Sequence, residues 1–341
     1  MAEIHSLIEH LGRDAALNQV VDENDRRRII WAADILSKEE ITRWYLHSGF
    51  CLVALPHGKP KDDHASYVLR NGKFSLILQP KAIGADEDGQ IELAGLPYGP
   101  KARLILMYVQ SYAIRNRSRT VVLGESMSDW LRRLGLTPSG GERGTIGAVQ
   151  EQAQRIARCE FTMVWEDGDR KRLRDQPLVK GLEMFADTTP AVEDRQMTLF
   201  AGEAGTSRKR RKRRYNWVRE IEVSQEFYDH LMENKVVLRE DAISRLKGSS
   251  WALDVYVWLA YRLRSVQAPT PPIPWPLLRD QFGNGYRSNL SMFKSIMREA
   301  LKDVLAVYPE ANVEWDNRGI ILRPSPPPVP RDIHQVKSIG A

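Results

Sequence analysis

The chain has 341 residues, a formal net charge of +6 and an apolar content of 42%, values typical of a soluble protein with two or three domains. No apolar run approaches the roughly 20 residues needed to cross a bilayer, and the N-terminus lacks the apolar core of a signal peptide. Cys51 and Cys159 are the only cysteines, which favours a reducing cytoplasm over a disulfide-bonded secreted fold. We expect a cytoplasmic protein without membrane contact.

Positive charge is concentrated in the middle of the chain. Residues 1–94 carry 11 Lys and Arg against 15 Asp and Glu, a net charge of −4, whereas residues 95–180 carry 15 against 9, a net charge of +6. Such a local excess suits a phosphate backbone. Farther along, seven consecutive residues are all cationic: Arg208, Lys209, Arg210, Arg211, Lys212, Arg213 and Arg214.

Residues 1–94 are expected to form a small N-terminal α/β module. The pattern predicts helices over Asp25–Leu36 and Lys38–Leu46. An Asn-Gly pair then joins two apolar runs, Tyr67–Arg70 and Lys73–Leu78. This pair is the strongest short-range signal for a β-hairpin, because both central residues must take positive φ.

Residues 95–184 follow the element order of a winged-helix DNA-binding domain. Pro100 suits the first turn of a helix, Thr120–Leu123 is typical of a short strand, and Ser126 can cap a second helix. After a glycine-rich turn, the spacing predicts a third helix over Thr145–Arg158. Its predicted buried stripe is Ile146, Val149, Ala153 and Ile156.

The third helix of this domain is the candidate DNA-reading element. Its other face begins with small residues and continues with Gln and Arg, which suits a helix lying in a major groove; the alternative is an ordinary amphipathic surface helix. Strands over Phe161–Trp165 and Arg170–Arg174 would form a basic wing that contacts the DNA backbone, and a solvated turn is the alternative. The candidate DNA contacts are Arg143, Thr145, Gln152, Arg155, Arg158, Arg170, Lys171 and Arg172.

Small and polar residues dominate 185–214 without a sustained helical or strand period, which predicts a flexible basic linker. Residues 215–325 repeat the order of helix, strand, helix, helix and hairpin, so a second winged-helix domain is predicted there, followed by a loose tail over 326–341. The expected fold class is therefore α+β, with tandem winged-helix domains behind the N-terminal module. On the long helix Arg287–Ala306, hydroxyls and cations share one face. The candidate contacts are Arg287, Ser291, Ser295, Arg298 and Lys302.

Four phrases carry a family resemblance: GLPYGPKARLIL from Gly95, SRTVVLGESMSDWLRRLGL from Ser118, SGGERGTI from Ser139 and QEQAQRIARC from Gln150. Together they resemble the RepA-type replication initiators of plasmids. The phrases are long and occur in the same order, so a chance match is improbable. The similarity extends from about Cys51 to Trp165 and is weaker in the C-terminal third.

The resemblance implies two tandem winged-helix domains that bind repeated sequences in double-stranded origin DNA. It also implies recruitment of the host helicase and the host initiator, and repression of the protein's own promoter as a homodimer. The alternative function is a winged-helix transcriptional repressor that uses the same surface without initiating replication.

The linker holds two candidate contact segments. The run Arg208–Arg214 would reach into a minor groove or across phosphates, and a solubilising linker is the alternative. The pentapeptide QMTLF resembles the sequence by which bacterial replication proteins dock on the sliding clamp, with a polar anchor and apolar plugs on a flexible strand; the alternative is a chance hydrophobic pair. Its candidate clamp contacts are Gln196, Met197, Leu199 and Phe200.

Enzymatic activity is not expected. The chain has no GxxxxGK[ST] phosphate loop, so ATP hydrolysis is not predicted. A nicking initiator needs a His-x-His metal pair and a nucleophilic Tyr, and the seven His residues contain no such pair. We therefore expect no catalytic residue, no metal and no cofactor.

Overall fold

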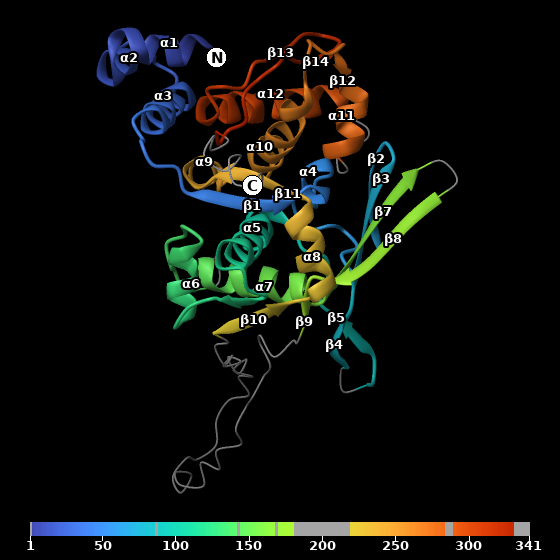
Figure 1. Cartoon of the computed structure of the whole chain (residues 1–341). Helices are drawn as coiled ribbons and strands as arrows, with labels where there is room; N and C mark the ends of the chain where they lie inside the picture. Colours follow the sequence, from blue (N-terminus) through green and yellow to red (C-terminus); the bar gives the residue numbers. More distant parts are fainter. Residues whose placement is uncertain are drawn as a thin grey trace, which may run out of the picture.

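The computed structural model describes residues 2–85, 88–141, 144–167, 170–180, 219–283 and 289–330. It shows a mixed α and β protein whose small sheets are antiparallel (Figure 1). Within these ranges, no helix has the length and apolar character required to cross a membrane. Among the described residues, one continuous hydrophobic core runs from Ile35 to Leu322.

Three helices open the chain: α1 (Ala2–Leu11), α2 (Arg13–Asn18) and α3 (Glu23–Leu36). The Asp22 carboxylate accepts hydrogen bonds from the backbone N–H groups of Asn24 and Asp25, both at 3.0 Å, so two of the free donors at the start of α3 are satisfied. The predicted helix over Asp25–Leu36 is confirmed.

The segment after α3 contains a strand where the sequence predicted a helix over Lys38–Leu46. Strand β1 (Arg43–His47) pairs with β11 (Lys235–Arg239), and the short helix α4 (Gly49–Leu52) follows it. Trp44 and Leu46 are buried on β1. Periodicity within the segment did not reveal the strand, because the partner that completes its hydrogen bonds lies almost 200 residues farther along the chain.

The predicted hairpin is confirmed as β2 (Tyr67–Asn71) and β3 (Phe74–Pro80), with Gly72 at φ +57° in the turn. β3 continues into a four-stranded sheet by pairing with β7 (Cys159–Asp167), which pairs with β8 (Arg170–Pro177). The N-terminal hairpin and the predicted wing therefore share one sheet across the expected boundary at residue 94.

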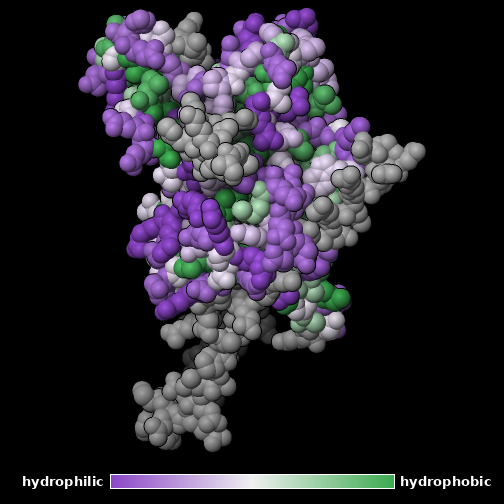
Figure 2. All heavy atoms as spheres, in the orientation of Figure 1, coloured by the Kyte–Doolittle hydropathy of each residue, from purple (hydrophilic) through white to green (hydrophobic). Residues whose placement is uncertain are grey.

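A two-stranded hairpin, β4 (Ala82–Ala85) and β5 (Ile91–Leu93), extends from this region. Ile91 is 71% exposed, and the hairpin is the hydrophobic patch at the lower right of Figure 2. The rest of the face in that view is mostly hydrophilic.

The first helical unit follows the predicted order. Its helices and first strand are α5 (Gly99–Asn116), β6 (Thr120–Val122), α6 (Met127–Arg133) and α7 (Thr145–Ala157). The hydroxyl of Ser126 accepts a hydrogen bond from the Asp129 N–H at 3.2 Å, which confirms the predicted cap of α6. Strand β10 (Glu220–Val223) lies between β6 and β9 (Val179–Lys180), so the segment expected to open the second domain completes a sheet of the first.

The second unit repeats this order: α10 (Ser250–Arg262), the short 3-10 helix η2 (Leu263–Ser265), β12 (Ile273–Pro274), α11 (Trp275–Phe282), α12 (Leu290–Val307), β13 (Val313–Trp315) and β14 (Gly319–Leu322). The strands form one sheet in the order β12–β14–β13. Two further helices, α8 (Gln225–Glu233) and α9 (Glu240–Leu246), flank β11.

A buried ion pair joins the two units between α5 and α10. Arg103 donates to both carboxylate oxygens of Asp254, from Nε to Oδ1 at 2.6 Å and from Nη2 to Oδ2 at 2.5 Å. Its other N–H groups donate to the backbone carbonyls of Leu55, Pro56 and Gly99. All five guanidinium donors are therefore used, in a side chain that is only 3% exposed.

His57 strengthens the same junction. Its ring stacks on Trp251, with centroids 3.7 Å apart, while Nδ1 lies 3.0 Å from Ser250 Oγ and Nε2 lies 2.9 Å from the Phe282 carbonyl oxygen. Burial, and then the charge of Arg103, hold the pKa of His57 well below its ordinary value. The ring is therefore neutral, with Nε2–H donating to the carbonyl and Nδ1 accepting from the hydroxyl.

Candidate nucleic-acid interface

The start of α7 is built by a polar turn. The Thr145 hydroxyl donates to the Thr137 carbonyl at 2.7 Å and accepts from the Ser139 N–H at 2.9 Å. A Cβ at Gly144 would lie 2.4 Å from the Ser139 carbonyl oxygen, so this position requires glycine. Thr145, a predicted DNA contact, therefore closes the turn that leads into α7.

The buried stripe of α7 is wider than predicted. Val149, Ala153 and Ile156 are buried as expected and Ile146 is partly buried, but Gln152 and Arg155 are buried as well. The prediction that these two side chains point away from the core is wrong. The helical projection assumed one packing surface, whereas α7 also packs against the segment that precedes α5.

Gln152 and Arg155 bind that preceding segment. Gln152 Oε1 accepts from the Tyr98 N–H at 2.8 Å. Arg155 Nη1 donates to Asp63 Oδ2 at 2.6 Å and to the Leu96 carbonyl at 2.9 Å. Burial alone would raise the pKa of Asp63, but the hydrogen bond and charge of Arg155 outweigh it and lower that pKa. Both predicted base-reading side chains therefore have structural partners.

Gly95 permits this arrangement. It has φ +80°, and a Cβ there would lie 2.3 Å from Arg155 Nη1. Because glycine alone accepts both the positive φ and the close guanidinium, the segment can pass directly over α7.

The outward face of α7 carries Gln150 and Gln154, which the sequence analysis did not single out. Both are partly exposed, and their amides have the donor and acceptor pair that fits an adenine edge. Glu151 lies beside them and accepts from Arg155 Nε at 3.0 Å and from the Tyr98 hydroxyl at 3.2 Å. The sequence shows that Gln150 and Gln154 are four residues apart. It does not show the second packing surface of α7, which leaves these two side chains on the outward face.

Arg158 follows the last turn of α7 and is partly exposed. Its backbone carbonyl accepts a hydrogen bond from the Lys81 N–H at 2.7 Å. Arg158 therefore lies where α7 meets the sheet that contains β3 and β7. Its predicted contact with DNA stays a prediction.

On α12 the predicted outward face is confirmed in its first half, where Ser291 and Ser295 are exposed. Arg298 is partly exposed and lies over the Trp275 ring, 5.4 Å from its centroid. Lys302 donates to Glu299 Oε1 at 2.8 Å. The structure thus brings the four described α12 candidates to one side of the helix.

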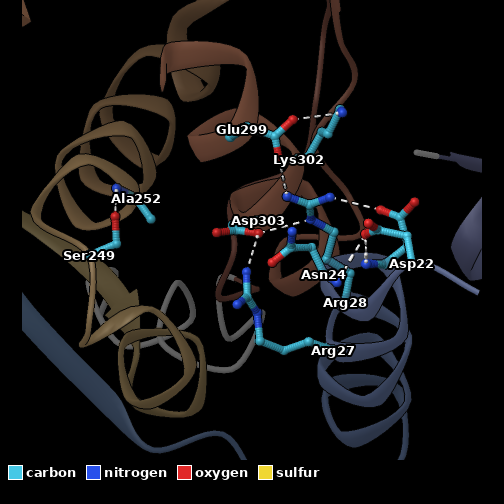
Figure 3. A network of polar contacts seen from close by, with 10 residues as sticks. Asp22, Asn24, Arg27, Arg28, Ser249, Ala252, Glu299, Lys302 and Asp303 are labelled. Carbon is cyan, nitrogen blue, oxygen red and sulfur yellow. Dashed lines mark hydrogen bonds and ion pairs between the residues drawn. The ribbon is translucent and has the colours of Figure 1, made fainter. Parts of the chain in front are cut away.

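The second half of α12 is covered by α3 (Figure 3). Arg28 is 2% exposed and reaches Glu299 Oε2 at 2.7 Å and Asp303 Oδ1 at 2.8 Å. Arg27 also approaches Asp303, at 3.4 Å. α3 therefore covers one side of the second half of α12, while Glu299 and Lys302 stay 49% and 39% exposed.

The predicted wing strands are present as β7 and β8, with Asp167 opposite Arg170 at the turn. The remaining predicted contacts lie outside the described residues or side chains: Arg143, Arg170, Lys171, Arg172, Gln196, Met197, Leu199, Phe200, Arg208, Lys209, Arg210, Arg211, Lys212, Arg213, Arg214 and Arg287. Across the described part of the chain, no three His, Cys, Asp or Glu side chains are grouped to hold a metal ion.

A family model described as "Plasmid encoded RepA protein" matches residues 96–270, which is half of the chain. The chain belongs to this RepA family. The matched range contains α5, α6, α7 and α10 and nearly all of the four phrases on which the resemblance rested; the segment from Cys51 to Gly95 lies outside it.

The chain was also compared with curated proteins and with solved structures. No curated protein matches this RepA-family chain. Among solved structures, it is similar to the crystal structure of selenomethionine derivatives of domains 2 and 3 of RctB, with 9% identity and a TM-score of 0.45, over 79% of this chain and 94% of that one.

Proposed function

We propose that this RepA-family protein is a plasmid replication initiator that binds origin DNA sequence-specifically. The observation that carries the proposal is the repeated unit of helix, strand, helix, helix and hairpin, which occurs once around α7 and once around α12. Two such units on one chain, in a family of plasmid-encoded RepA proteins, fit a protein that engages repeated sequences at an origin.

Each unit is proposed to be a winged-helix domain. In the second unit the sheet order β12–β14–β13 brings the strand before α11 beside the terminal hairpin, which is the pairing that a winged helix needs. In the first unit β6 pairs with β10, which pairs with β9, while the hairpin of β7 and β8 lies in a separate sheet beside β3. The helix before each hairpin, α7 or α12, is the element that would enter a major groove.

The polar faces of these two helices support the assignment. Gln150 and Gln154 are partly exposed on α7, and Ser291 and Ser295 are exposed on α12. Amide and hydroxyl side chains suit base edges and phosphates. The basic run Arg208–Arg214 would add phosphate contacts between the two units.

Recruitment of host proteins is part of the proposal. The pentapeptide from Gln196 to Phe200 is proposed to dock on the sliding clamp, and contacts with the host helicase and host initiator, as well as a dimer that represses the protein's own promoter, follow from the resemblance. We further propose that the protein performs no covalent chemistry itself and acts in the cytoplasm.

The deciding experiment supplies the gene in trans to a non-replicating plasmid that carries the DNA flanking the gene. Stable maintenance is the expected result. In parallel, a gel shift measures binding of the purified protein to the same DNA and to a scrambled duplex of equal length.

The outcomes separate the functions. Specific binding without maintenance would indicate a transcriptional repressor that uses the same surface. If the protein neither binds this DNA nor maintains the plasmid, both the initiator and the repressor function are contradicted. Strand cleavage of a supercoiled plasmid with a divalent metal would contradict the expectation that the protein is not an enzyme.

A further inference from the structure

A groove runs between α12 and β13. It encloses about 380 Å³. The three cations of its lining, Lys294, Arg298 and Lys302, are spaced by four residues, so they form a row along one side of the helix at intervals of about 6 Å. The lining residues are Ser291, Lys294, Ser295, Arg298, Glu299, Lys302 and Trp315.

Lys294 and Arg298 make no ion pair with a carboxylate in the described part of the chain. Lys294 Nζ reaches the Asn317 carbonyl at 3.4 Å, and both cations lie over the Trp275 ring, 5.9 Å and 5.4 Å from its centroid. Trp275 is 1% exposed, so the core fixes the ring that holds the two charges near each other. Two neighbouring cations without a carboxylate between them attract an anion.

The third cation of the row is already paired. Lys302 donates to Glu299, which also accepts from Arg28 (Figure 3). The hydrogen bond from Lys302 and the interactions with Arg28 together lower the pKa of Glu299, so this carboxylate is charged at neutral pH. The free positive charge of the groove therefore lies toward the N-terminal half of α12.

Trp315 supplies an aromatic surface beside this charge. It comes from β13 and is partly exposed. A cationic groove with an aromatic side chain is the combination that holds a nucleic-acid strand independently of its sequence, with phosphates on the cations and a sugar or base against the ring.

We propose that this groove binds the sugar–phosphate backbone of one nucleic-acid strand, with Lys294 and Arg298 on phosphates and Trp315 against the sugar or base between them. The proposal rests on the proposed DNA-binding function. It assigns Lys294 and Trp315, two residues that the sequence analysis did not single out, and it gives Glu299 an opposing role, since its carboxylate occupies Lys302 and repels a phosphate.

The test is the salt dependence of binding to two probes, the origin duplex and a dT oligonucleotide. Lys294→Gln should make log affinity fall less steeply with log salt, by about 0.9 on the duplex or 0.7 on the single strand. Trp315→Ala should weaken binding to the strand that occupies the groove, by roughly 5- to 150-fold if a base stacks on the ring. Glu299→Gln should strengthen binding because it frees Lys302.

Arg323→Gln is the matched control. Arg323 is also a cation, but it pairs with Glu314 at 3.0 Å and does not line the groove, so its removal changes the net charge equally and should leave the slope as in wild type. Thermal unfolding of each variant checks that it is folded.

Each pattern of results has a distinct meaning. Changes on the duplex alone assign the groove to a duplex backbone, and changes on the dT probe assign it to a single strand; both support the proposal. If Lys294→Gln behaves like Arg323→Gln and Trp315→Ala keeps wild-type affinity on both probes, the groove is not a strand site, although origin binding by wild type would leave the proposed function intact. If wild type binds neither probe, the proposed function fails with it.

Discussion

Replacing Asp254 by Leu should destabilise the protein strongly. The substitution leaves the Arg103 guanidinium buried at 3% exposure without its carboxylate. Removing one partner of a buried ion pair costs about 3–5 kcal/mol, because the remaining charge is neither solvated nor compensated. At about 2.1 cal/mol/K of unfolding entropy per residue, that loss lowers the melting temperature of a 341-residue chain by roughly 4–7 °C.

The double variant Arg103→Met with Asp254→Leu should recover much of this loss. Both charges are then absent, and two of the three carbonyls that Arg103 contacted keep backbone partners: Pro56 accepts from the Gly99 N–H at 2.9 Å, and Gly99 lies within α5. The Leu55 carbonyl loses the guanidinium donor, which costs about 1–3 kcal/mol if it stays buried.

Urea unfolding, monitored by circular dichroism, measures the free energy of unfolding of wild type, of Asp254→Leu and of the double variant. Glu314→Gln is the control, because it breaks the exposed pair with Arg323, in which the two side chains are 38% and 53% exposed, and should cost at most about 1 kcal/mol. A loss for Asp254→Leu no larger than this control would refute the view that the Arg103–Asp254 pair holds the two units together.

Two further predictions concern the same junction and the surface of α7. Because the pKa of His57 is held well below that of an unfolded histidine, about 6.5, the unfolded state binds more protons at acid pH. The free energy of unfolding should therefore fall as pH drops below about 6.5, by up to about 1.4 kcal/mol per pH unit, and urea titrations of His57→Phe should lack this part of the slope; an identical pH dependence would contradict the prediction. Arg155→Ala should lower stability by about 3–5 kcal/mol and reduce binding to origin and scrambled duplex alike, whereas Gln154→Ala should keep wild-type stability and weaken binding to origin DNA selectively, as measured by thermal unfolding and gel shifts. A selective loss of origin binding in a fully stable Arg155→Ala variant would restore Arg155 as a base-reading residue.

The sequence alone determined the elements whose signals are local. An Asn-Gly pair requires a tight turn, and the hairpin of β2 and β3 forms there. Ser126 caps α6 as predicted, and the predicted helices over Thr145–Arg158 and Arg287–Ala306 are present as α7 and α12. The family followed from contiguous phrases, since these keep their order whatever their surroundings in the fold.

The tertiary structure decided what depends on residues far apart in the chain. Strand β1 needs β11 to satisfy its backbone groups, and β10 enters a sheet of the first unit across the linker. Arg103 and Asp254 are 151 residues apart, so their spacing carries no information about their contact. The exposed face of α7 depends on a second surface, where Asp63 binds Arg155. A helical projection shows which residues share a face, but only the packed neighbours determine which face meets solvent and so remains available to DNA.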